Sequence, residues 1–241
     1  MRFVGERKAL AALVLAVFGL LFLLNGLLGP AQFQAMFLCL AGVYFLGFFG
    51  VVAGYFWARW YSLGIGISGV AMAVIGWWQI GAEPVLLFWG AAHAVVSLVL
   101  IGKGPTAAFD GRKDWRERYR MDDDAANRLG KAIMRAGASL PYLIAAGLAP
   151  KQSLGLALLG FGVVALGVVA LVGLFRLRVW GVLAVAATAA LAAGTLGQEV
   201  GWFAPAATNF TALPGAGIVA AALLGLALVP FARPVVRFLR A

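Results

Sequence analysis

His93 is the residue whose type and position point most directly to chemistry. It is the only histidine among 241 residues, and it follows Pro84 by nine positions in an otherwise apolar stretch. An ionisable side chain at the middle of a membrane helix is costly and usually faces the interior of a helix bundle. Trp89 and Ser97 share its helix face, because residues four positions apart lie one above the other. His93, Ser97 and Trp89 therefore form a candidate intramembrane polar site.

Two interpretations of His93 are open from the sequence. In the first, the imidazole accepts a proton or contacts a ligand in a polar cavity, since His changes charge near physiological pH. In the second, a neutral imidazole donates a hydrogen bond to a backbone carbonyl or to a hydroxyl on a neighbouring helix. Only the first interpretation makes His93 a functional group.

A second candidate site is a mouth at the outer side of the membrane. Its four residues lie at or directly after the ends of two apolar stretches, at equivalent places in the two halves: Gln79, Glu83, Gln198 and Glu199. If the two carboxylates were paired, they would form the opening of a cation or proton pathway that ends at His93. The alternative is that each acid is a solvated cap of its helix.

Metal and cofactor chemistry is not indicated by the sequence. One His and one Cys, Cys39, do not supply the three or four convergent ligands that a zinc site takes. The run Asp122–Asp124 predicts the start of a helix, because carboxylates at a helix N-terminus accept hydrogen bonds from backbone N–H groups. The run does not indicate a metal site, because adjacent helical residues point about 100° apart and their carboxylates converge poorly on one ion. We expect no metal and no cofactor.

Composition indicates that lipid is the solvent for most of the chain. Hydrophobic residues make up 63% and charged residues 12%, with a mean hydropathy of +0.97, which excludes a soluble domain of this length. Seven uncharged stretches are long enough to cross a bilayer. They are Ala9–Leu28, Ala35–Ala58, Tyr61–Ile80, Pro84–Ile101, Leu154–Phe175, Val179–Leu196 and Leu213–Phe231. The sequence predicts an all-α polytopic membrane protein.

An eighth span, Ile133–Ala149, is predicted from charge rather than from hydropathy. This stretch contains Arg135 and Pro141, and hydropathy alone would make it re-entrant or interfacial, leaving seven spans. With eight spans and both termini cytoplasmic, every Lys and Arg except Lys151 lies on the cytoplasmic side. Cytoplasmic loops carry an excess of these residues, so the eight-span topology is favoured over seven.

Eight spans divide the chain into two four-helix halves, residues 1–102 and 132–241, joined by a charged cytoplasmic loop at 103–131. Both halves would begin and end in the cytoplasm, so a repeat between them would be parallel. Helices with inside Arg and outer polar caps also arise without duplication, and the two explanations stay open.

The loop carries basic residues interleaved with aromatic ones over a short segment. These are Arg112, Lys113, Trp115, Arg116, Arg118, Tyr119 and Arg120. Such a segment favours contact with anionic lipid headgroups, with the aromatic rings at the membrane surface. A nucleic acid partner is not expected, because the basic run is short and tethered to the membrane.

Three function classes follow from these observations. A small permease of unknown substrate is favoured by His93 and the repeat. A non-enzymatic structural or regulatory subunit, with a membrane-protein partner, is favoured by Gly/Ala-rich helix faces and scarce buried charge. An enzyme acting on lipid-like substrates ranks third, since no paired carboxylates, Cys/His or Ser/His groups share a depth. The predicted location is the bacterial inner membrane.

Overall fold

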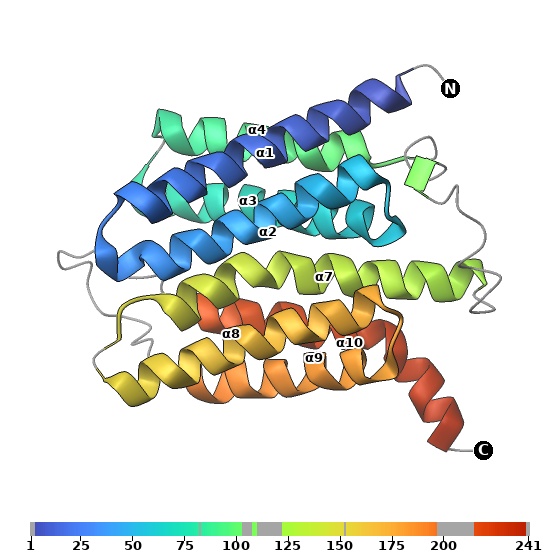
Figure 1. Ribbon diagram of the computed structural model, residues 1–241. Coiled ribbons are helices and arrows are strands. Elements are labelled where there is room, and N and C mark those ends of the chain that lie inside the picture. The colour runs from blue at the N-terminus through green and yellow to red at the C-terminus, as the bar shows by residue number, and fades with distance from the viewer. Residues whose placement is uncertain are drawn as a thin grey trace. The chain divides into compact units, whose positions relative to one another are not determined.

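The computed structural model describes residues 3–81, 83–102, 108–109, 122–151, 153–196 and 215–239, with the backbone alone for 196 and 233–239. All regular structure in this part of the chain is helical (Figure 1). The elements are α1 (Val4–Leu28), a 3-10 turn (Ala31–Phe33), α2 (Gln34–Ala53), α3 (Phe56–Ile80), α4 (Pro84–Leu100), α7 (Asp123–Leu148), α8 (Leu154–Phe175), α9 (Val179–Leu191), a π turn (Ala192–Leu196) and α10 (Ala216–Leu239).

The helices have the length and composition of a membrane protein. Four are long and apolar enough to cross a bilayer, namely Val4–Leu28, Ala31–Ala53, Phe56–Ile80 and Leu154–Phe175, and three further apolar helices are shorter. Their outer faces are covered by large apolar side chains: Leu13 on α1 is 60% exposed and Phe161 on α8 is 60% exposed. Such faces are stable against lipid and unfavourable against water. The chain is therefore a helical, membrane-embedded protein.

The predicted boundary between the second and third stretches is wrong. Instead of a break at Arg59-Trp60, α2 ends at Ala53 and α3 begins at Phe56. Gly54 makes the turn with a φ of 73°, a backbone conformation that only glycine adopts at little cost. Arg59 then lies in the first turns of α3, where its guanidinium has a backbone partner, so its charge does not interrupt the helix.

The chain forms two compact units. The first consists of Met1–Leu21 and Ala41–Ala138, and the second of Phe22–Leu40 and Ser139–Ala241. Helices α1, α2 and α7 thus contribute one part to each unit. The candidate site lies entirely in the first unit.

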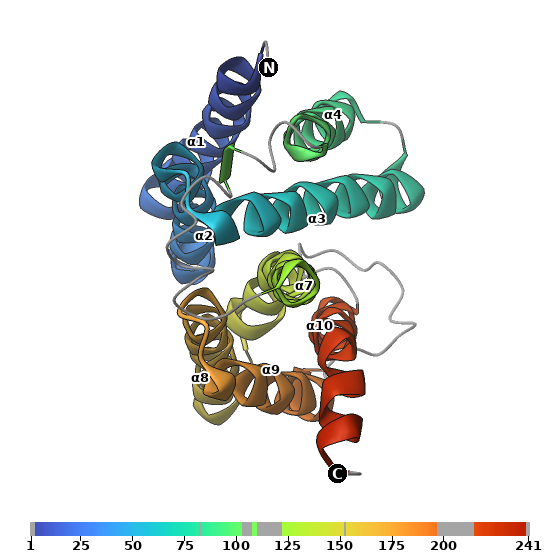
Figure 2. The same cartoon turned by 90° about the vertical axis from the view of Figure 1, so that its right-hand side faces the viewer.

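In the first unit, α3 and α4 are an antiparallel pair joined by a short turn (Figures 1 and 2). Their register is fixed by two hydrogen bonds: Arg59 Nε donates to Leu100 O at 2.9 Å, and Trp89 Nε1 donates to Gly69 O at 3.1 Å. In the second unit, α9 packs between α8 and α10. There Gly173 and Gly181 let α8 and α9 approach so closely that a Cβ on either would overlap the other backbone.

Helix α7 contains most of Ile133–Ala149, the stretch that charge predicts to cross the membrane and hydropathy does not. It runs for 26 residues without a break at Pro141, and its start confirms the predicted helix N-terminus, because Asp122 Oδ1 accepts from the Ala125 N–H. It is not among the four candidate spans. Its central side chains are buried; Ile133, Leu143 and Ile144 are each at most 1% exposed.

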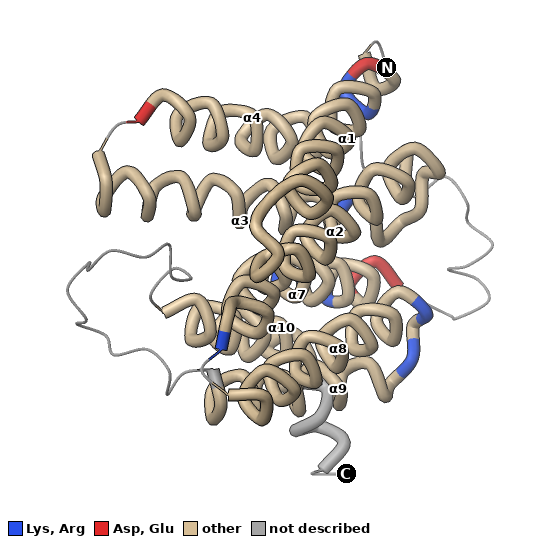
Figure 3. Tube along the Cα trace, turned by 60° about the vertical axis from the view of Figure 1, so that its left-hand side comes forward, with Lys and Arg blue, Asp and Glu red and all other residues tan. Residues whose placement is uncertain are grey.

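Charged residues lie at helix ends in each unit (Figure 3). In the first unit, Arg7 and Arg59 bind backbone carbonyls at the end of α4, whereas Glu83 directly precedes its start. In the second unit, Lys151 precedes α8 and Arg176 follows it, so both ends of this helix carry a basic residue. Only the first unit has ends of opposite charge among these residues.

Candidate functional site

His93 lies where four helices of the first unit meet. Its side chain is 0% exposed. Phe18 from α1 packs on the imidazole with ring centroids 4.5 Å apart, and Tyr44 from α2 meets it edge-on at 5.7 Å. Trp89, one turn away on α4, stacks on it at 4.7 Å and 26°. The imidazole is thus enclosed by three aromatic rings.

Both imidazole nitrogens have hydrogen-bond partners, and the partners determine the tautomer. Nδ1 lies 2.8 Å from Trp89 O, and Nε2 lies 2.6 Å from the Tyr44 hydroxyl oxygen. A carbonyl oxygen only accepts, so Nδ1 carries the proton. In a neutral imidazole Nε2 then has a lone pair, and the Tyr44 hydroxyl donates to it. The site is a buried Tyr–His pair of defined polarity.

Gly69 allows α3 to approach His93. A Cβ at this position would overlap the imidazole ring, so no other residue fits without displacing it. Its carbonyl also accepts from Trp89 Nε1, which fixes the indole beside the imidazole. The close approach of α3 and α4 therefore sets the position of both rings.

Two serines lie on the side of His93 that faces Arg59. Ser97, one turn along α4, places its hydroxyl against Gly66 of α3, where a Cβ would overlap it. Ser62 on α3 is 0% exposed, and its hydroxyl faces Gly47 of α2. The Oγ atoms of Ser62 and Ser97 are both buried without a hydrogen-bond partner in the described part of the chain. Hydroxyls in this state cost stability unless a further partner is supplied.

Basic side chains close the end of the first unit beyond these serines. Arg59, 9% exposed, donates to Leu100 O, and Arg7 donates to the carbonyls of Leu98 (3.2 Å) and Ile101. Lys8 Nζ donates to Val52 O at 3.0 Å. Cations at helix C-termini satisfy carbonyls that lack helical partners and complement the helix dipole. These residues tie the starts of α1 and α3 to the ends of α2 and α4.

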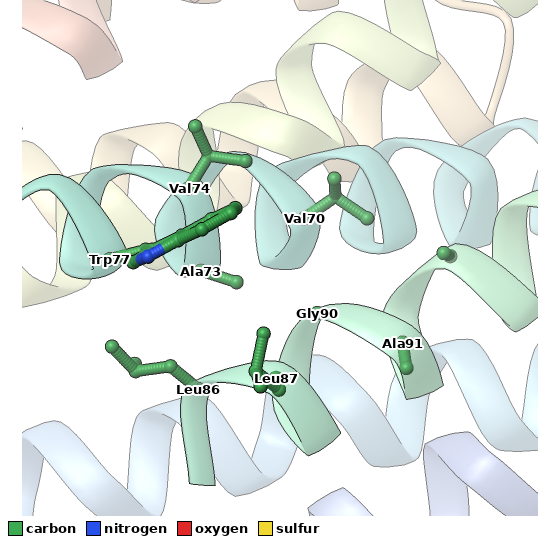
Figure 4. A pocket seen from close by; sticks show the side chains of 9 residues that line it. Val70, Ala73, Val74, Trp77, Leu86, Leu87, Gly90 and Ala91 are labelled. Atoms are coloured by element: carbon green, nitrogen blue, oxygen red, sulfur yellow. The ribbon is translucent and has the colours of Figure 1, made fainter. Parts of the chain in front are cut away.

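The opposite end of the α3–α4 pair is an apolar groove (Figure 4). Its volume is about 280 Å³, and Val74 and Trp77 from α3 and Leu86, Leu87 and Gly90 from α4 are among the residues that line it. Trp77 is 53% and Leu87 is 53% exposed, so the groove opens to the side of the helix pair.

The predicted site residues are placed as follows. His93 and Trp89 are in contact, and Ser97 lies one helical turn from His93. Gln79, near the end of α3, and Glu83, before α4, are both exposed, and Glu83 makes no side-chain capping bond. Gln198, Glu199 and the basic loop residues lie outside the described residues: Arg112, Lys113, Trp115, Arg116, Arg118, Tyr119 and Arg120.

Sequence reasoning missed Tyr44, Phe18, Ser62 and Arg59 as parts of the site. Ser62 could have been found, since it precedes Gly66 by one turn on the same face of α3. Tyr44 and Phe18 carry no signal, because each is one of several aromatic residues on its helix and the partner choice depends on how α1 and α2 pack against α4.

No group of three or more potential metal ligands occurs among the residues that the structure describes. No protein-family model, no curated protein sequence and no solved structure matches the chain.

Proposed function

We propose that the protein is a small multi-span permease whose polar site, the Tyr44–His93 pair, exchanges protons. The observation that carries this proposal is a 0% exposed histidine hydrogen-bonded to a tyrosine at the meeting point of four apolar helices. Intramembrane ionisable groups are costly to keep and commonly belong to proton relays or substrate pathways. A Tyr–His hydrogen bond is also a proton-transfer geometry, since one proton is shared between two groups that can each hold it.

The proposed topology has eight spans with both termini cytoplasmic, in a bacterial inner membrane. Helix α7 supports it, because 26 residues at about 1.5 Å each exceed the ~30 Å of a hydrocarbon core. A span whose faces are buried against protein does not need the hydropathy of one that faces lipid. Arg135 lies at the middle of α7 but near the cytoplasmic start of the predicted span Ile133–Ala149, from where its flexible stem can reach the membrane surface.

The topology is tested by cysteine accessibility in a Cys39→Ala background. With eight spans, a cysteine replacing Lys151 reacts with a membrane-impermeant maleimide added outside intact cells, and one replacing Arg178 reacts only after lysis. With seven spans the two results are exchanged, because α7 no longer crosses. The two positions flank one helix, α8, so each serves as the control for the other.

Proton exchange is tested with the purified full chain in vesicles that contain a pH-sensitive dye. Under a potassium diffusion potential, wild-type vesicles should change internal pH faster than protein-free vesicles, and His93→Leu should return the rate to the protein-free level. The control is Thr188→Ala, which removes a buried hydroxyl that binds Ala184 O in the second unit. A wild-type rate equal to that of protein-free vesicles would contradict the proposal.

A structural or regulatory membrane subunit is the second candidate. It is favoured by the enclosure of His93, whose two nitrogens are both satisfied and whose ring is packed on three sides by Phe18, Tyr44 and Trp89. Buried polar pairs of this kind also fix the packing of membrane helices. A native mass spectrum with a stoichiometric protein partner, together with no proton flux, would establish this role in place of the first.

A further inference from the structure

The α3–α4 pair differs on the two sides of His93. On the side toward Glu83, Phe18 and Trp89 cover the imidazole, and the apolar groove follows. On the side toward Arg59, the buried groups include the hydroxyls of Ser97 and Ser62 and then the guanidinium of Arg59. In the described part of the first unit, buried polar groups therefore continue from His93 toward the Arg59 end of the α3–α4 pair.

The spacing of these groups suits single water molecules. Ser97 lies four residues from His93 along α4, and Ser62 lies four residues from Gly66, the glycine that faces Ser97. Four residues correspond to an axial rise of about 6 Å. One water bridges such an interval, because two hydrogen bonds of about 2.8 Å each span ~5.6 Å.

Further hydrogen-bonding groups lie near the Ser62 hydroxyl. Ser62 Oγ faces Gly47, where an added Cβ would be in ordinary contact with it at 3.4 Å. Gly47 is one turn from Tyr44 on α2, and the Tyr44 oxygen can accept a hydrogen bond while it donates to His93. Buried waters typically make about three hydrogen bonds to polar groups that lack other partners.

We propose that Ser62 and Ser97 bind a short row of water molecules that connects the Tyr44–His93 pair to the Arg59 end of the first unit. The ligand class is water, and its consequence is that protons reach the pair from that end. This inference rests on the proposed role of the pair as a proton-exchanging site, but hydration and flux are measured separately.

The test uses the fact that His93 is the only histidine in the chain, so ¹⁵N-histidine labelling gives the signals of one imidazole. In lipid vesicles, solid-state NMR measures the rate at which magnetisation passes from water to its nitrogens. Ser62→Val and Ser62→Thr are matched, because the two side chains have nearly the same shape and only Thr retains the hydroxyl. Ser97→Val and Ser97→Thr form a second matched pair.

We expect Ser62→Val to slow the transfer at least about threefold while Ser62→Thr keeps the wild-type rate. The inference would be overturned if, at both positions, the Val and Thr variants transferred magnetisation from water to the imidazole at the same rate. A wild-type imidazole that receives no water magnetisation would also overturn it. If transfer depends on the hydroxyls but vesicles show no proton flux, the water row stands and the permease proposal fails.

Discussion

The same two helices, α3 and α4, form two different interfaces on either side of His93. Toward Arg59, the residues of α3 from Ala58 to Gly69 are largely buried, and the interface contains serines and a guanidinium. Toward Glu83, the pair opens into an apolar groove in which Trp77 is 53% exposed. Lipid offers no hydrogen-bond partners, so a hydroxyl in a membrane helix needs a partner from the protein or from bound water. In this helix pair, the buried hydroxyls lie where protein covers the helices, and apolar side chains line the part that is open.

The largest expected loss of stability comes from adding a side chain at Gly69, which lies at the boundary between these two interfaces. Gly69→Ala puts a Cβ into the His93 ring, and overpacking of this kind costs about 1–3 kcal/mol or more. We expect a lower midpoint in thermal unfolding in detergent and loss of the Trp89–His93 stacking. The matched control is Gly162→Ala on α8, where nothing lies within 4 Å, and it should leave the midpoint unchanged or slightly raised. Equal midpoints for the two variants would contradict the close approach.

A smaller effect is expected from removing the hydroxyl that binds His93. Tyr44→Phe leaves Nε2 buried without a donor, which costs about 1–3 kcal/mol. The double variant Tyr44→Phe, His93→Leu should cost less than the sum of its single changes, because the two polar groups disappear together. Denaturant unfolding in mixed micelles measures this cycle. Additive costs would mean that the two groups do not interact.

The smallest changes in the free energy of unfolding are expected from substitutions at the two ends of the helix pair. Arg59→Met removes the donor to Leu100 O and leaves a carbonyl at the end of α4 without it, so we expect a loss of about 1 kcal/mol. Glu83→Gln, at the exposed start of the same helix, should change the free energy of unfolding by less than about 0.5 kcal/mol. The pair is compared in the unfolding assay above. If Glu83→Gln lowered the free energy of unfolding as much as Arg59→Met, the two ends of the pair would not differ in their contribution to stability.

The sequence predicted the class of the fold and the place of His93 near the middle of an apolar helix, because both depend on local apolar runs. It misplaced the start of α3, because Arg59 was interpreted as a break although its charge is satisfied by Leu100 O. The pairing of His93 with Tyr44 could not be predicted, since it requires the register of α2 against α4, which is set by side-chain packing between helices. The eight-span topology and the outer mouth at Glu83 and Glu199 stay predictions.

The central claim is that His93 is a neutral, enclosed imidazole whose Nε2 accepts from Tyr44. The most direct measurement is the ¹⁵N spectrum of the single labelled histidine at neutral pH, in wild type and in Tyr44→Phe. The account predicts a protonated Nδ1 and an unprotonated Nε2, with a shift of Nε2 alone when the Tyr44 hydroxyl is removed. A protonated Nε2 in the wild type, or an Nε2 signal that does not change in Tyr44→Phe, would contradict it.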